Sequence, residues 1–249
     1  MLINELTDKR TKTIKGRNEF IYNEMMKNAS ESIEAFKSEN IIYKGMFIPN
    51  NKDIYITDPK LKKRKSVGTT SNHYTQLLSN LPSWEDYPKR DSSLICTTQS
   101  SIARDFGRIF IVLPFDSATI AVCPGHDIWT AQTEIPETSL LFFNDILKEC
   151  NISDTSYKNL IASILKNKNK IYNCKFLDKD SEFAYELSMC RTYNGVINLL
   201  DNFLSPNKMG FYTSSIMNIP RDENHEVWTD SKSYLVRIDS DFYNYLLDI

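Results

Sequence analysis

The sequence predicts an α+β fold built on an antiparallel β-sheet that draws its strands from both ends of the chain. Three observations support this prediction. Apolar residues recur at helical spacing near the N-terminus and again in the middle of the chain. Runs rich in β-branched and aromatic residues lie before and after the middle helices. None of the seven glycines forms a glycine-rich phosphate loop or a dinucleotide fingerprint, which argues against the common nucleotide-binding α/β folds.

The first half of the chain begins with an expected amphipathic helix over residues 13–39. Gly45, inside the strand that follows, indicates a close approach by another part of the chain. The hydroxyl of Thr98 or that of Ser100 is suited to cap a short helix at about 101–106. The other expected elements of this half are strands at 41–48 and 53–57, a basic loop at 59–70, a helix at 71–81, and strands at 92–98, 108–115 and 118–123.

The second half is expected to begin with helices and to return to strands. The expected elements are helices at 137–149, 156–167 and 181–204, strands at 210–215, 225–230 and 233–238, and a last helix at 240–247. We therefore expect a single domain over residues 1–249, with an N-terminal helix at 13–39 and a helical insertion at about 137–204.

Composition excludes several classes of protein. Hydrophobic residues make up 41% of the chain and the net charge is -2, so neither disorder nor a general affinity for nucleic acid is indicated. No segment approaches the roughly 18 apolar residues of a membrane span, and the N-terminus lacks the apolar core of a secretory signal. The lack of a span and of a signal predicts a cytoplasmic setting. The five cysteines are widely spaced without a C-x-x-C pair, so we expect reduced thiols and no metal.

Three short segments carry the candidate chemistry, provided that the early, middle and late strands share one sheet. They are Tyr43-Lys44-Gly45, Cys96-Thr97-Thr98 and Asn224-His225-Glu226. A lysine inside an apolar strand must face water or find a partner, so Lys44 is either an edge residue or a ligand contact. Glu226 is either a solvated residue at the start of a strand or a functional carboxylate.

The order of these segments resembles the ADP-ribosyltransferase superfamily, with its Y-R-G-like strand, its S-T-S-like strand followed by a helix, and its late Glu at a strand start. The closer resemblance is to a group of bacteriophage proteins of that kind. It is carried by "KRKSVGTT", "SSLICTTQSSIARDFGRIFIVLPF", "VCPGHDIW" and "HEVWTDSKSYLV". It covers residues from about 41 to 130 and from 223 to 237, and leaves the helices between 137 and 204 outside.

The resemblance implies a split antiparallel sheet that binds NAD as a substrate, with Glu226 and Lys44 as catalytic residues. A carboxylate there stabilises the positive charge that develops on the ribose carbon as the nicotinamide bond breaks. The basic loop around Arg64 would clamp phosphates or guide an acidic acceptor, and Tyr43 or Trp129 would stack near a ring. The residues expected to bind NAD are Tyr43, Lys44, Gly45, Arg64, Thr69, Cys96, Thr97 and Thr98.

This chain departs from the family pattern at three positions. Lys44 stands where the first motif has Arg, and a lysine lacks the planar fork that grips two oxygens. Cys96 replaces the first hydroxyl of the middle motif. Asn224 stands two residues before Glu226, at the position that the family uses to select the acceptor.

The expected partners are NAD and an acceptor that is a host protein or nucleic acid, and the expected setting is the host cytoplasm. Two alternatives stay open at this point. One is an NAD glycohydrolase with water as the only acceptor, and the other is a non-catalytic phage protein that keeps the fold and blocks a host defence.

Overall fold

The computed structural model describes residues 14–47, 52–61, 73–128, 140–152, 156–221 and 223–249. The fold is α+β, with an eight-stranded antiparallel sheet and, in these residues, nine α-helices. The chain divides into two compact units. The first comprises residues 1–63, 92–122 and 213–249, and the second comprises residues 64–91 and 123–212.

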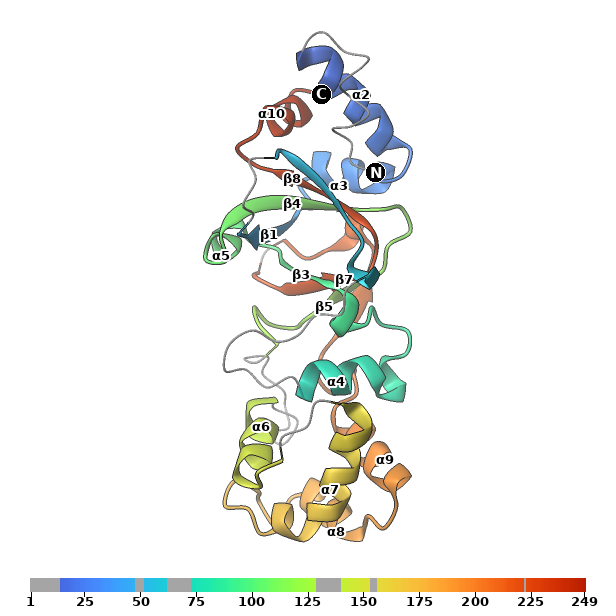
Figure 1. The fold of residues 1–249 in the computed structure, drawn as a ribbon, viewed down its shortest axis with the longest axis vertical. Helices are drawn as coiled ribbons and strands as arrows, with labels where there is room; N and C mark the ends of the chain where they lie inside the picture. The colour runs from blue at the N-terminus through green and yellow to red at the C-terminus, as the bar shows by residue number, and fades with distance from the viewer. Residues whose placement is uncertain (1–13, 48–51, 62–72, 129–139, 153–155, 222) are drawn as a thin grey trace. The chain divides into compact units, whose positions relative to one another are not determined.

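The sheet of the first unit has the strand order β2-β8-β4-β1-β3-β7-β5-β6 (Figure 1). Strands from the last quarter of the chain therefore share one sheet with strands from its first half, as the sequence predicts. The strands are β1 (Ile42–Met46), β2 (Ile54–Thr57), β3 (Leu94–Thr97), β4 (Arg108–Pro114), β5 (Ile120–Val122), β6 (Tyr212–Ser214), β7 (Glu226–Thr229) and β8 (Ser233–Arg237). Each lies within a run that the sequence marks as a strand.

One face of this sheet is covered by three helices, α2 (Ile14–Met26), α3 (Ser30–Lys37) and α10 (Asp241–Leu247) (Figure 1). Side chains alternate between faces along a strand, so Ile111 packs with these helices while its neighbours Phe110 and Val112 pack on the opposite face. Each face has its own apolar cluster. Burial on both faces explains the continuous apolar run of β4.

The predicted helix over 13–39 is wrong in one respect, because it is two helices with a break at residues 27–29. The cause is a distant carboxylate. Asp116 accepts hydrogen bonds from the main-chain N–H of Glu31 (2.9 Å) and from the hydroxyl of Ser30 (3.0 Å). These bonds satisfy the otherwise unpaired first turn of α3, and so a new helix begins at Ser30.

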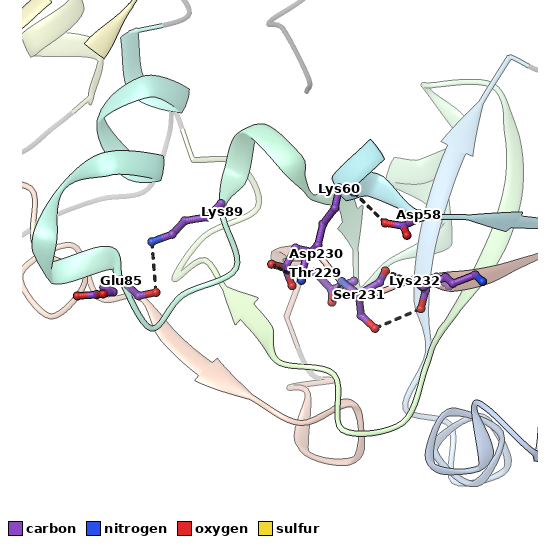
Figure 2. A network of polar contacts seen from close by, with 9 residues as sticks. Asp58, Lys60, Glu85, Lys89, Thr229, Asp230, Ser231 and Lys232 are labelled. Atoms are coloured by element: carbon purple, nitrogen blue, oxygen red, sulfur yellow. Dashed lines mark hydrogen bonds and ion pairs between the residues drawn. The ribbon is translucent and has the colours of Figure 1, made fainter. Parts of the chain in front are cut away.

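The turn that joins β7 to β8 is held by short polar contacts (Figure 2). The hydroxyl of Thr229 accepts a hydrogen bond from the main-chain N–H of Ser231 at 3.2 Å. The ammonium group of Lys60 lies 3.1 Å from the carboxylate of Asp230. This exposed ion pair contributes less than about 1 kcal/mol, so the turn depends mainly on its own hydrogen bonds.

The second unit is helical and contains α4 (His73–Asn80), α6 (Leu140–Glu149), α7 (Tyr157–Tyr172), α8 (Glu182–Met189) and α9 (Tyr193–Phe203). Its core includes Trp84, whose indole N–H donates to the carbonyl of Leu204 at 2.7 Å. The predicted single helix at 181–204 is wrong, because the hydroxyl of Thr192 accepts from the N–H of Gly195 and begins a separate helix.

The end of α3 places a side chain in a strained backbone conformation. The N–H of Asn40 bonds to the carbonyl of Ala35 and the N–H of Glu39 bonds to that of Phe36, which is the Schellman pattern. Glu39 has a φ of 63° in this turn, where glycine is usual. This left-handed conformation turns the chain from the end of α3 toward Asn40 and β1.

We predict that Glu39→Gly raises the free energy of unfolding by about 0.5–1 kcal/mol. Relief of a left-handed conformation that costs about 1–2 kcal/mol is partly offset by the larger entropy of glycine in the unfolded chain. Chemical denaturation measures the change. The matched control is Glu34→Gly on the exposed face of α3, which should lose about 1 kcal/mol. Equal losses in both variants would contradict the prediction.

Candidate functional site

The candidate residues gather at one end of the sheet of the first unit. There β1 begins, β3 ends and β7 begins. The register aligns Tyr43 with Thr97, and Thr97 in turn with Glu226. Residues directly opposite one another in neighbouring strands project to the same face, so the side chains of Tyr43, Thr97 and Glu226 form a row across three strands.

Glu226 is the carboxylate of this row and is only 8% exposed. It begins β7, next to the segment 223–225 that leads into the strand. Carboxylates are rarely buried to this extent without a polar partner. The buried position is the one that an electrostatic role requires, because a charge removed from water acts strongly on a group brought beside it.

Tyr43 lies at the other end of the row and is half-buried. Burial raises the pKa of its hydroxyl above the ordinary value, and the nearby Tyr243 raises that pKa further. The raised pKa favours the neutral form, in which a tyrosine hydroxyl donates a hydrogen bond.

The two threonines at the end of β3 fix the segment that leads into β7. The hydroxyl of Thr98 donates to the carbonyl of Glu223 and accepts from the N–H of His225, both at 2.9 Å. The N–H of Thr98 also donates to the carbonyl of His225 at 3.1 Å. The expected capping role of Thr98 and Ser100 is wrong, since α5 (Ser100–Arg104) has Gln99 as its N-cap and no side-chain cap.

Asn224 is held beside the row by Thr97. The hydroxyl of Thr97 donates to the side-chain oxygen of Asn224 at 2.7 Å and accepts from the N–H of Gln99 at 3.2 Å. Asn224 and Glu226 thus lie at one site, with Thr97 in contact with the first and in register with the second. The structure brings together Tyr43, Thr97, Thr98, Asn224 and Glu226 from the sequence-based candidates.

Lys44 does not belong to the row. It lies opposite Phe110 in β4, whereas Tyr43 lies opposite Ile111, so the two neighbours project to different faces of the sheet. Its ammonium group donates to the main-chain carbonyl of Ile95 at 2.8 Å. The register pair between β1 and β3 is Tyr43–Thr97, and the side chain of Lys44 adds a hydrogen bond between these strands.

Gly45 and Cys96 pack against other parts of the fold and do not line an open ligand site. A Cβ atom on Gly45 would lie 1.8 Å from the carbonyl oxygen of Ala103, so the missing side chain lets α5 pack against β1. Cys96 is buried in the apolar cluster of the face opposite the row. Arg64, Thr69 and Trp129 lie outside the described residues.

Sequence reasoning missed two residues at this end of the sheet, Asn40 and Arg221. Together with Glu39, Tyr43 and Thr98 they line a pocket of about 70 Å³. The side-chain nitrogen Nε of Arg221 donates to the side-chain oxygen of Asn40 at 2.7 Å. A cation is therefore present beside the row, but it comes from the loop before β7 and not from β1.

Comparison of the chain with protein-family models, with curated proteins and with solved structures gives no match. Within the described part of the chain, no cluster of three or more His, Cys, Asp or Glu side chains is arranged to hold a metal ion. None of the helices described is long and apolar enough to span a bilayer. The assignment of the site therefore depends on its own geometry.

We predict that Gly45→Ala destabilises the first unit by about 2–3 kcal/mol, because an added methyl group overlaps the backbone of α5. Thermal unfolding measures the loss. The control is Gly195→Ala in α9, where the nearest atom to an added Cβ is the Thr192 hydroxyl oxygen at 3.3 Å and stability should be maintained. A Gly45→Ala variant as stable as the wild type would contradict the packing explanation.

We predict that Thr98→Val costs about 1–3 kcal/mol, because the N–H of His225 and the carbonyl of Glu223 lose their partner. Thr98→Ser keeps the hydroxyl and should lose less than about 1 kcal/mol, the value of one buried methylene group. Amide hydrogen exchange at His225 is the specific measurement, with faster exchange in Thr98→Val alone. Unchanged protection in that variant would show that the hydroxyl does not hold the segment.

Proposed function

We propose that the protein is an NAD-dependent ADP-ribosyltransferase with the split-sheet fold of that superfamily, encoded by a phage and acting on a host macromolecule. The observation that carries the proposal is the row in which the buried carboxylate of Glu226 stands in register with Thr97 and Tyr43. The three motifs that resemble the superfamily contribute one residue each to this row. Their sequence separation is large, so their meeting at one end of the sheet supports the resemblance.

The reaction requires a fixed negative charge. Breaking the bond between nicotinamide and ribose leaves positive charge on the ribose carbon, and a buried carboxylate stabilises that charge more than it stabilises the bound ground state. In the proposal Glu226 performs this role, and it also orients the incoming nucleophile. Thr97 positions the site, because its hydroxyl bonds to Asn224 and its strand position fixes Glu226.

Some of the residues in and beside the row are suited to bind a dinucleotide, and others have a different role. Tyr43 offers a half-buried aromatic ring and a protonated hydroxyl beside the row. Asn224, placed two residues before Glu226, is the proposed contact with the acceptor, which is a host protein or nucleic acid. Lys44 has a different role in the proposal, since its bond to the carbonyl of Ile95 makes it a brace between strands. The proposed setting is the host cytoplasm.

The test uses the full-length protein, NAD labelled on its adenylate part, and bacterial lysate. We expect the wild type to transfer label to macromolecules and Glu226→Gln to lose at least about 100-fold in rate, a size typical for removal of a group that stabilises transition-state charge. Glu34→Gln, on the exposed face of α3, is the matched control and should retain the rate. Equal labelling by Glu226→Gln and wild type would reject the role of Glu226.

A second candidate is a protein that keeps the fold without the chemistry. Two observations favour it: Lys44 lies on the other face of the sheet from the row, and Cys96 is buried in the core in place of a hydroxyl. The same experiment separates the candidates. Release of free ADP-ribose without labelled macromolecules would select NAD hydrolysis, and an unchanged NAD pool would select the non-catalytic protein.

A further inference from the structure

The small pocket beside the row has features of a built binding site. It lies where α3 leads into β1, and its lining includes Asn40, Tyr43, Thr98 and Arg221. Its volume of about 70 Å³ exceeds the roughly 15 Å³ that one water molecule needs. That leaves room for a compact polar group.

Arg221 is held in place by a buried partner. Asn40 is 6% exposed, and its side-chain oxygen accepts from Arg221 Nε while its side-chain nitrogen donates to the carbonyl of Met217, each at 2.7 Å. Both ends of the Asn40 amide are thereby fixed. Because the guanidinium is anchored through Nε, part of the entropy that an arginine loses on binding is already lost before a ligand arrives.

The terminal nitrogens of Arg221 remain available to a ligand. Over the described residues, no carboxylate forms an ion pair with Arg221. Glu39 also lines the pocket but is not paired with it. Tyr43 also contributes to the lining, whereas the hydroxyl proton of Thr98 is already donated to Glu223.

We propose that this pocket is a subsite for a phosphoryl group, which the terminal N–H groups of Arg221 bind in a two-pronged contact. Guanidinium geometry matches two oxygens of a phosphate, and the pocket has room for one such group. The natural ligand inferred here rests on the proposed function: it is NAD, with one phosphoryl group of its diphosphate in the pocket. β1 and β7 are two strand spacings apart, or about 10 Å, so a ligand in the pocket also reaches the neighbourhood of Glu226.

Binding is tested by isothermal titration of the full-length protein with pyrophosphate, with ADP-ribose and with adenosine, which has no phosphate. We expect pyrophosphate and ADP-ribose to bind, adenosine to bind far more weakly, and Arg221→Gln to weaken the first two by about tenfold or more. Arg221→Lys, which keeps the charge but loses the fork, should fall between. Arg104→Gln on exposed α5 changes the net charge equally and should bind as the wild type does.

A gain-of-affinity variant makes the test sharper. Glu39→Gln removes a negative charge from the pocket lining and should strengthen pyrophosphate binding severalfold, since like charges repel. Thermal unfolding of each variant shows that the fold is kept. Titration with inorganic phosphate distinguishes the source of the group: equal affinity for phosphate and pyrophosphate would indicate a site for free phosphate and overturn the diphosphate assignment.

The subsite and the proposed function fail in different ways. If wild type does not bind pyrophosphate or ADP-ribose, or if Arg221→Gln binds them equally well, the subsite is rejected even if label is transferred from NAD. If pyrophosphate binding depends on Arg221 but wild type neither transfers ADP-ribose nor consumes NAD, the subsite stands and the enzymatic proposal is rejected.

Discussion

The candidate site depends on one constraint, the strand register that sets Thr97 between Tyr43 and Glu226. A slip of one residue in either pairing would turn one side chain of the row to the opposite face, because side chains alternate along a strand. The hydroxyl of Thr98 protects the pairing with β7 by bonding to both Glu223 and His225. The position of the buried carboxylate is thus set by main-chain geometry before any ligand contact is made.

Much of the fold could be predicted from the sequence, because strand and helix periodicities are local properties. All eight strands fall within predicted runs. The break before α3 could not be predicted, since it depends on Asp116, which lies 85 residues away from Glu31 in the chain. The break between α8 and α9 had a local signal in Thr192, a good N-cap residue that continuous apolar spacing obscured.

The sequence predicted the site correctly only for motif residues that lie opposite one another in neighbouring strands. Thr97 and Glu226 meet because their strands pair. Lys44 illustrates the limit, since a motif of three consecutive residues in a strand cannot project all of them to one face. Arg221 carried no signal at all. Its anchor, Asn40, is 181 positions away, and only the folded chain brings the two together.

The bond from Lys44 to the carbonyl of Ile95 has a mechanical consequence. Four strands lie on either side of the β1–β3 boundary, and one register pair joins the two groups there. The long side chain of Lys44 adds a bond across the same boundary. The apolar cluster on that face also spans the boundary, because it takes Ile42 and Phe110 from one group of strands and Cys96 and Val227 from the other. Lys44 thereby helps to tie the two groups of strands together beside Thr97.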